Sequence, residues 1–328
     1  MAILHAKCTR CGGRVHRFGG RRRRCTRCGR TWSIRPKRRG RKPRRPQLSL
    51  VKAIIRDKYP ARQLHRRHHC SYATLRRRIS AATRRFVQLP GDYGLPPGDL
   101  VLVVDALWSI LGGQLWVLYN LALKPVAANV AWFLDPYLGC GRENTANWQS
   151  ALAAVDRSIT ERVKALVSDG LRAFPGIVRQ HNWVHQLCHR HLLRSVERAL
   201  GWFRRYPPDP WLRAPIYRIL CNALETSDGR QADVLCDELA VLIGEHNCTR
   251  LLRRSVGEFL RQRNAFRAYR QHPELHLPKT TSMVESMHSQ LRRAISTTNN
   301  PRSLWERAQA FIRLHPRWTC NGTDCTQK

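Results

Sequence analysis

The stretch Leu100 to Trp108, LVLVVDALW, decides which fold the rest of the chain can adopt. Its first five residues are branched aliphatics without polar alternation, which predicts a strand that is buried on both faces. Asp105 follows this run directly, so we expect its carboxylate at the carboxyl end of the strand. Ligands bind outside that end in open α/β sheets, so other carboxylates of the chain are candidates for the same rim.

The chain is strongly basic. Its 59 Lys and Arg residues oppose only 22 Asp and Glu residues, which gives a formal net charge of +37 over 328 residues. A chain with this charge repels itself unless a polyanion offsets it, so we expect nucleic acid as the partner. No stretch has the apolar length that crosses a bilayer, and the first residues, MAILHAKC, lack the apolar region of a secretory signal. Composition therefore argues against a membrane protein or a secreted one.

Two CxxC pairs mark the amino-terminal region, where residues 1–46 hold 18 Lys or Arg and no acid. Such a segment needs a second organising force to fold, and four thiolates supply the closed tetrahedral set of structural zinc. A Gly follows each pair, in CTRCGG and CTRCGR, which suits a tight turn whose backbone amides point at sulfur. The symmetry of the pairs argues against redox thiols. We predict a small zinc ribbon of two or three strands over residues 1–34, with the ligands Cys8, Cys11, Cys25 and Cys28.

A basic linker and a helix-turn-helix are predicted next. The segment that ends at residue 46, IRPKRRGRKPRRP, is rich in Pro, Gly and Arg, and it could either lie along phosphates or be a solvated tether. Apolar residues then predict a first helix near residues 48–55 and a short second one at Ala61–His65.

The third helix of this region is the candidate for DNA recognition. Ser71 can cap it, and Leu75 and Ile79 lie one turn apart to face a core. An Arg run faces the opposite side, as a recognition helix in a helix-turn-helix requires, although an ordinary basic amphipathic helix is the alternative. The residues expected to bind DNA are Arg76, Arg77 and Arg78.

Further strands follow the opening one. Leu115–Leu123 and Asn129–Leu134 predict hairpin partners, so we expect an antiparallel meander. A helix near Asn144–Val155 precedes Val163–Val167, another apolar run, which ends on Ser-Asp-Gly and so brings Asp169 to the end of a second buried strand.

The predicted order continues with a fifth strand at Trp183–Leu187 and a helix from His189. An order of β-β-β-α-β-α-β differs from a doubly wound sheet, which alternates throughout, and indicates an α/β fold with a mixed sheet. From residue 207 to 272 apolar residues recur at helical spacing, which predicts an all-helical insertion. The sequence TTSMVE that follows predicts a capped helix with Glu285 in its first turn.

Asp105, Asp169 and Glu285 form the candidate active site. Carboxylates that converge in so basic a protein suit hard divalent cations, which offset their repulsion and bring phosphate oxygens into the site. Two ions of Mg²⁺ or Mn²⁺, about 4 Å apart, could activate an attacking water or hydroxyl and stabilise the leaving oxygen of a phosphodiester displacement. A lone Asp at a strand end is more often a turn or capping residue, and Asp135, Asp156 and Asp209 are assigned to that class.

Four motifs in order resemble the Mutator superfamily of bacterial insertion-sequence transposases and their eukaryotic Mutator-like relatives. They are VDALW (104–108), SDG (168–170), QLCHRH (186–191) and TTSMVES (280–286), and the resemblance spans roughly residues 100–312. It implies a ribonuclease H-like domain with an Asp-Asp-Glu triad, an all-α insertion between the second Asp and the Glu, and an amino-terminal DNA-binding region.

By this resemblance Asp105, Asp169 and Glu285 would be the metal ligands, and Cys188 with His191 would be the CxxH signature of the family. That pair lies one turn apart on a helix, but two ligands make an incomplete metal site, so a packing or hydrogen-bonding role is an equal alternative. The sequence departs from the family near the Glu, where Ser282 and His288 occupy positions that often carry Asn.

The activity implied by the resemblance is metal-dependent cleavage of DNA at the element ends, followed by attack of the freed 3′-hydroxyl on target DNA. A homo-oligomer would act on terminal inverted repeats at the nucleoid, in the cytoplasm of a prokaryote. Two alternatives remain open, which are a sequence-specific DNA-binding regulator with an inactive ribonuclease H-like domain and a metal-dependent DNA nuclease.

The predicted domain organisation follows from these elements. Most of the ten Trp residues, including Trp108 and Trp116, are expected to pack in the core, although these two could approach a distorted DNA end. The expected parts are a zinc ribbon (1–34), a basic linker (35–46), a helix-turn-helix (47–90), the first part of a catalytic core (98–206), an all-helical insertion (207–272), the last core helices (273–315) and an irregular tail (316–328).

Overall fold

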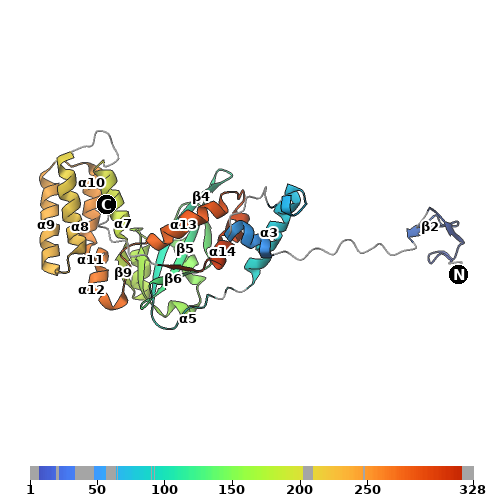
Figure 1. Cartoon of the computed structure of the whole chain (residues 1–328), viewed down its shortest axis with the longest axis horizontal. Coiled ribbons are helices and arrows are strands. Elements are labelled where there is room, and N and C mark those ends of the chain that lie inside the picture. Colours follow the sequence, from blue (N-terminus) through green and yellow to red (C-terminus); the bar gives the residue numbers. More distant parts are fainter. Residues whose placement is uncertain are drawn as a thin grey trace. The chain divides into compact units, whose positions relative to one another are not determined.

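The chain forms two compact units, Met1–Pro46 and Gln47–Lys328. The predicted basic linker, most of the second predicted helix, Asp209 and the last nine residues lie outside the described residues. The computed structural model describes residues 7–19, 22–33, 48–56, 64, 66–89, 91, 93–201, 210–246 and 248–319 (Figure 1).

The amino-terminal unit is a small antiparallel sheet. Three strands pair in the order β1-β2-β3, which confirms the prediction of two or three strands. Cys8 and Cys25 are its buried apolar residues within the described range, so cysteine side chains take the place of an aliphatic core. The strands are β1 (Val15–Arg17), β2 (Arg22–Cys25) and β3 (Thr31–Ser33).

A seven-stranded mixed sheet organises the larger unit. Its strands follow the order β10-β6-β5-β4-β8-β9, and β7 pairs with β5 beside this path. The predicted antiparallel meander is present as β4, β5 and β6, whereas β8 and β9 join β4 in parallel. The strands are β4 (Leu100–Leu111), β5 (Gln114–Pro125), β6 (Val130–Phe133), β7 (Tyr137–Cys140), β8 (Val163–Ser168), β9 (Val184–Leu187) and β10 (Arg317–Thr319).

Strand β4 corrects the expectation that Asp105 ends a strand. The strand continues to Leu111, because two glycines with positive φ close a long hairpin to β5. Its parallel pairing with β8 stops at Val103 and Val167, however, so Asp105 lies just beyond the end of β8. The residue is therefore inside a strand and still at the rim of the parallel part of the sheet.

Two further strands were not predicted. The short β7 follows Pro136 and pairs with the outer half of the hairpin. The tail, expected to be irregular, contributes β10, which pairs with β6 at one edge of the sheet.

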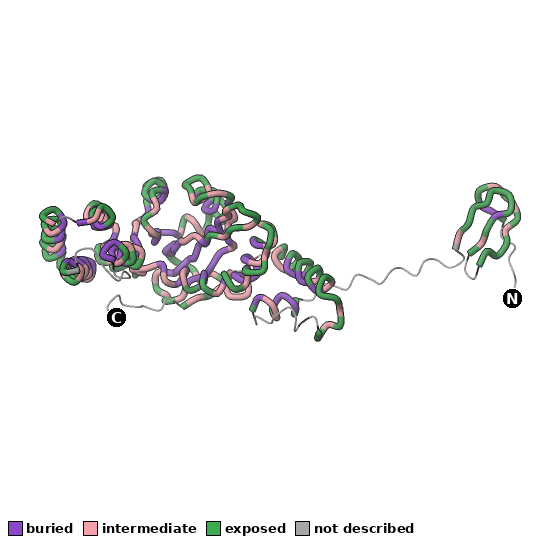
Figure 2. The backbone as a smooth tube through the Cα atoms, turned by 90° about the horizontal axis from the view of Figure 1, so that it is seen from above, coloured by how far each residue is buried: buried purple, intermediate pink, exposed green. Residues whose placement is uncertain are grey.

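Helices cover both faces of the sheet (Figure 1). The buried residues of α13 (Ser282–Ile295) and α14 (Pro301–Leu314) pack in one core, and those of α4 (Thr145–Ala153) and α6 (Phe174–His181) pack in another. Figure 2 shows buried residues concentrated along the strands between these layers. The short α5 (Arg157–Thr160) connects α4 to β8.

Side chains of β4 alternate between the two cores. Val101 and Val103 belong to the core beneath α13 and α14, whereas Leu100 and Leu102 belong to the core beneath α4 and α6. Because side chains alternate along a strand, Asp105 lies on the face that α13 covers.

The amino-terminal helices of the larger unit pack on this core. The predicted cap is confirmed, since Ser71 Oγ accepts from the amide of Thr74 at 3.2 Å, and Leu75 and Ile79 are buried as expected. Leu50, Leu64, Leu75 and Ile79 form a small core of their own, and Ala82 joins the main core. The helices are α1 (Leu48–Val51), the π-helical η1 (Lys52–Arg56) and α3 (Tyr72–Gln88).

A helical region lies between β9 and α13. Described residues 210–246 and 248–275 form helices and no strand. Most of their buried residues pack with α7 in a core of their own, whereas Ala268 belongs to the core beneath α13 and α14. Among the helices of the described ranges, none has the length and apolar character needed to span a membrane. The helices are α7 (His189–Ala199), η2 (Pro210–Leu212), α8 (Arg213–Glu225), α9 (Gly229–Glu245), α10 (Arg250–Arg261), α11 (Arg263–Phe266), α12 (Ala268–Gln271) and η3 (Pro273–Leu275).

Candidate active site

The three predicted acids come from three elements that meet at one rim of the sheet. Asp105 lies in β4, Asp169 directly follows β8, and Glu285 lies in the first turn of α13. The side chains of Asp105 and Glu285 are only 13% and 17% exposed. Burial raises the pKa of Asp105 to about 7, and the charges of Asp169 and Glu285 raise it too, while His191 lowers it.

The loop after β8 holds Asp169 in place. Its Oδ1 accepts from the amide of Leu171 at 3.4 Å, and its carbonyl accepts from the same amide at 2.9 Å. Burial raises the pKa of Asp169, and the positive charge of His191 counteracts that effect. Two half-buried carboxylates at one rim are therefore poised to take up positive charge.

His191 lies close to all three acids. Its Nε2 is 3.8 Å from Glu285 Oε1. A hydrogen bond with Cys188, together with the charges of Cys188, Asp105 and Asp169, raises the pKa of His191 to about 9, although burial lowers it. An imidazolium cation at this position offsets part of the negative charge that the acids gather.

Cys188 ties the start of α13 to the end of β9. Its buried Sγ accepts hydrogen bonds from the amide of Thr281 at 3.3 Å and from Thr281 Oγ1 at 3.4 Å. The amide of His189 donates to the carbonyl of Lys279 at 2.9 Å. These bonds fix the residues just before α13, and so they set the position of Glu285.

Cys188, His191 and Glu285 have donor atoms that all lie within 4.8 Å of one another. Three donors are one fewer than structural zinc requires, and the thiol already accepts from Thr281. Of the two roles left open for the CxxH pair, hydrogen bonding is the one that the structure displays. Asp105 and Asp169 do not join this group within the same distance.

A buried chain of polar groups reaches Asp105 from β5 and α13. His288 Nδ1 lies 3.4 Å from Asp105 Oδ2, and His288 Nε2 lies 2.8 Å from Asn120 Nδ2. The Asn120 amide nitrogen also donates to the carbonyl of Leu118 at 3.0 Å, so it is a donor toward both partners. His288 Nε2 therefore accepts, and the ring proton resides on Nδ1 and faces Asp105. Burial lowers the pKa of His288 to about 3, so the ring is neutral at neutral pH.

Several of these residues were given no role from the sequence. Asn120 is the amide inside the apolar run LWVLYNLAL, and His288 follows Glu285 by three residues on the same helical face, so both carried a signal. Arg190 Nε lies 3.1 Å from Glu285 Oε2. Glu143 accepts from the indole of Trp148 at 2.8 Å, and burial raises its pKa, as does the charge of Asp169. No local pattern distinguished these last two.

The acids suit a hard cation. Glu285 Oε1 is buried and has no hydrogen-bond partner among the described residues, and Asp105 and Asp169 offer two more carboxylates at the same rim. Carboxylate oxygens are the ligands that Mg²⁺ and Mn²⁺ prefer, so the residues present fit the ions expected from the sequence.

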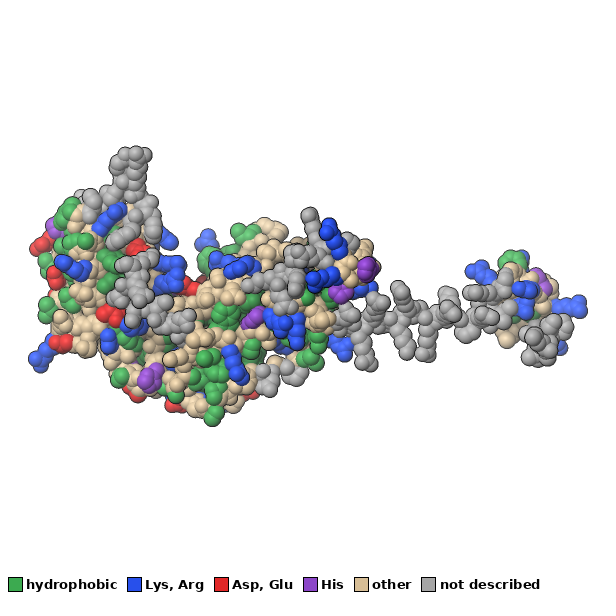
Figure 3. Space-filling model, viewed as in Figure 1, with side chains coloured by type: hydrophobic (Ala, Val, Ile, Leu, Met, Phe, Trp, Pro, Cys, Tyr) green, Lys and Arg blue, Asp and Glu red, His purple; other side chains and the backbone are tan. Residues whose placement is uncertain are grey.

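The predicted DNA-contacting residues lie elsewhere on the larger unit. Arg76 and Arg77 are exposed and line a groove of about 390 Å³ between α3 and the start of α14, whereas Arg78 is half-buried. Figure 3 shows Lys and Arg side chains over this part of the surface. Trp108 is 55% exposed, which corrects the expectation that it packs in the core.

The second predicted metal site lies in the amino-terminal unit. Cys8 Sγ is 3.7 Å from Cys28 Sγ, Cys11 Sγ is 3.5 Å from Cys25 Sγ, and all four sulfurs lie within 4.8 Å of one another. The four cysteines could therefore bind a structural metal such as zinc. A backbone amide at Arg10 lowers the pKa of Cys8 to about 6, which favours the thiolate.

The glycines after each CxxC explain this geometry. Gly12 and Gly29 have φ values of +66° and +67°, and their amides donate to the carbonyls of Cys8 and Cys25. A Cβ at Gly13 would lie 2.6 Å from Arg27 Cβ and 3.0 Å from Cys25 Sγ, so only glycine fits beside the cluster.

Comparison of the sequence with models of known protein families and with curated proteins gave no match, so the assignment of function depends on the geometry described above.

Proposed function

We propose that the protein is a DDE transposase of the Mutator type, which cleaves the ends of a DNA element and joins them to target DNA. The observation that carries the proposal is the convergence of Asp105, Asp169 and Glu285 from three separate elements around His191. The strand order β6-β5-β4-β8-β9, antiparallel and then parallel, supports a ribonuclease H-like core.

Each acid has a role in this proposal. Asp105, Asp169 and Glu285 would hold two Mg²⁺ or Mn²⁺ ions, which when bound supply activation of the attacking oxygen and stabilisation of the leaving oxygen. His288 would orient the carboxylate of Asp105, since its Nδ1 proton faces Oδ2. Cys188 would keep Glu285 at the rim through its bonds to Thr281.

The basic parts of the chain would hold the DNA. The four-cysteine unit would be a zinc ribbon, and α1 to α3 would be a helix-turn-helix whose Arg76 and Arg77 contact phosphates or bases. The net charge of +37 supplies the attraction for DNA, which salt should weaken steeply.

The test is cleavage and strand transfer on linear duplex DNA that carries the sequences flanking the reading frame. With Mg²⁺ or Mn²⁺ we expect nicks at the element ends and products joined to a second DNA, and we expect both to disappear in Asp105→Asn and Glu285→Gln. The matched control is Asp99→Asn, which removes an exposed carboxylate just before β4 and should leave activity unchanged.

Two outcomes would overturn the proposal in favour of the alternatives. Tight binding of the flanking DNA without metal-dependent nicking, unchanged in Glu285→Gln, would indicate a regulator. Nicking without any joined product would indicate a nuclease.

A further inference from the structure

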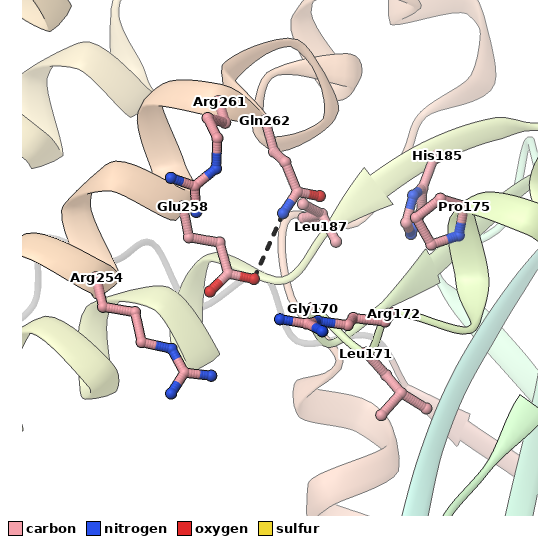
Figure 4. Close-up of a pocket in the computed structure, with 10 residues that line it drawn as sticks. All are labelled: Gly170, Leu171, Arg172, Pro175, His185, Leu187, Arg254, Glu258, Arg261 and Gln262. Carbon is pink, nitrogen blue, oxygen red and sulfur yellow. Dashed lines mark hydrogen bonds between the residues drawn. The ribbon is translucent and has the colours of Figure 1, made fainter. Parts of the chain in front are cut away.

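A cavity of about 650 Å³ lies directly beside the loop that carries Asp169 (Figure 4). Gly170, Leu171 and Arg172 line one side, and residues of α10 line the other. The cavity therefore separates the sheet from the helical region and begins at the residue after a candidate metal ligand.

Three arginines surround this cavity. Arg254 and Arg261 come from α10, and Arg172 faces them from the loop after β8 (Figure 4). All three are exposed, and none has an ion pair or a hydrogen bond with another residue of the described ranges. The single carboxylate in the lining, Glu258, accepts from Gln262 at 3.4 Å. Three unpaired guanidinium groups thus face one carboxylate.

These three arginines are distinguished by lining the same cavity, whereas some other arginines of this unit lie against acids. Arg190 pairs with Glu285, and both Arg84 and Arg302 pair with Glu306. Three guanidinium groups around one cavity repel one another, so a cavity that gathers them without an acid for each is suited to an anion. Guanidinium donors match phosphate in particular, because they can bind it bidentately.

The position of the cavity next to Asp169 indicates that the anion is a phosphate of the DNA strand. Gly170 and Arg172, which line the cavity, directly follow Asp169, so the cavity lies beside the place where a phosphodiester would react. The volume lies in the range of pockets for small ligands, so a short stretch of single strand fits, and a duplex does not. Leu171 and Pro175 add apolar surface beside the charged groups, as a sugar or base requires.

We propose that this cavity, lined by Arg172, Arg254 and Arg261, binds the sugar-phosphate backbone of a single DNA strand immediately next to the phosphodiester at the three acids. This assignment rests on the proposed function for the identity of the strand. It makes α10 a part of the DNA-binding surface, together with α3.

The test uses the full chain with the photoreactive residue benzoylphenylalanine in place of Leu171 and a labelled duplex that ends in a single-stranded overhang. Ultraviolet light should crosslink the overhang to the protein. The double variant Arg254→Ala with Arg261→Ala should lower the crosslink yield at least fivefold at equal total DNA bound. Arg253→Ala is the matched control, because it removes an exposed arginine of the same helix that does not line the cavity, and it should leave the yield unchanged.

A second measurement localises the contact. One phosphate of the overhang at a time is replaced by a neutral methylphosphonate, and crosslinking is repeated. In the chain that keeps Arg254 and Arg261, the methylphosphonate nearest the reacting phosphodiester should reduce the crosslink yield on the order of tenfold. In the double variant it should cause no further reduction, because the arginines and the phosphate are partners in one interaction.

The outcomes separate this inference from the proposed function, because crosslinking does not require cleavage. A crosslink without any cleavage activity would leave the cavity assignment standing and overturn the transposase. Cleavage without a crosslink, a yield that is unchanged in the double variant, or a crosslink to a second copy of the chain instead of DNA would overturn the cavity assignment.

Discussion

Replacing Asp105 by Asn should abolish activity and yet stabilise the metal-free protein. The carboxyl is 13% exposed, and burial raises its pKa from 3.8 to about 7. The folded state then holds a proton that the unfolded state releases, so stability falls as pH rises from about 4 to about 7 and levels off above. At 1.36 kcal/mol for each pKa unit, the ionised Asp105 lowers the free energy of unfolding above pH 7 by on the order of 4 kcal/mol.

The variant does not recover all of that free energy. Asp105 accepts from the amide of Ala106 at 2.8 Å, and the proton of His288 faces its other oxygen. Asn has one acceptor, so one of these donors would oppose the new NH₂ group, at a cost of about 1–3 kcal/mol. Above pH 7 we therefore expect a net stabilisation of about 1–3 kcal/mol, which corresponds to roughly 2–4 °C in Tm for each kcal/mol.

The assay is thermal and urea unfolding of both proteins in chelator at several values of pH. The difference in the free energy of unfolding should grow by about 1.4 kcal/mol for each pH unit between pH 5 and 7. A difference that does not change over this range would refute the reasoning. Asp156→Asn is the control of opposite sign, because hydrogen bonds with Ser158 lower the pKa of that exposed capping residue, and its removal should bring no gain at high pH.

Three further outcomes are expected. His288→Ala should weaken activation by Mg²⁺ about 10–100-fold in a metal titration, with a smaller loss of rate at saturating metal, since the ring acts through Asp105; equal losses in both would contradict a positioning role. Cys25→Ser should release one equivalent of zinc per chain and leave the unfolding transition of the larger unit in place, whereas Cys140→Ser, outside the cluster, should retain the metal; zinc is measured by mass spectrometry. Arg76→Ala with Arg77→Ala should reduce the slope of log affinity against log salt on duplex DNA by roughly 0.9 for each phosphate that the variant no longer neutralises, and an unchanged slope would exclude both side chains from the interface.

Strands were predictable from the sequence where burial on both faces requires an uninterrupted apolar run. The cysteine cluster was predictable because the spacing of the two CxxC pairs alone identifies the ligands. The continuation of β4 beyond Asp105 was not predictable. Trp108 and Ile110 are apolar and yet 55% and 73% exposed, so this part of the strand lacks the pattern of a buried strand. Strand β10 depends on pairing with β6, a contact between distant parts of the chain.

In the candidate site, too, residues marked by a local sequence pattern were predictable, and residues placed by distant contacts were not. The three acids were visible because each follows an apolar run or opens a helix. The contact of Asn120 with His288 joins residues 168 positions apart, and that of Cys188 with Thr281 joins residues 93 apart. A tertiary contact of this kind leaves no mark on local periodicity, so the surroundings of the acids required the structure.

The bonds between β9 and the residues around it have a consequence for how the chain can vary. Gln186 donates to the carbonyl of Phe266 at 3.0 Å and accepts from the amide of Tyr269 at 2.8 Å, just as Cys188 holds Thr281. The helical region therefore leaves the sheet after β9 and returns to it beside the same strand. The end of α8 is held at the same place, since Tyr269 donates to the carbonyl of Leu224 at 2.8 Å and Lys279 Nζ lies 2.6 Å from Glu225 Oε2. Helix α9 lies farther along this region and could lengthen or shorten while Glu285 keeps its place, because the entropy of closing a loop changes only slowly with its length.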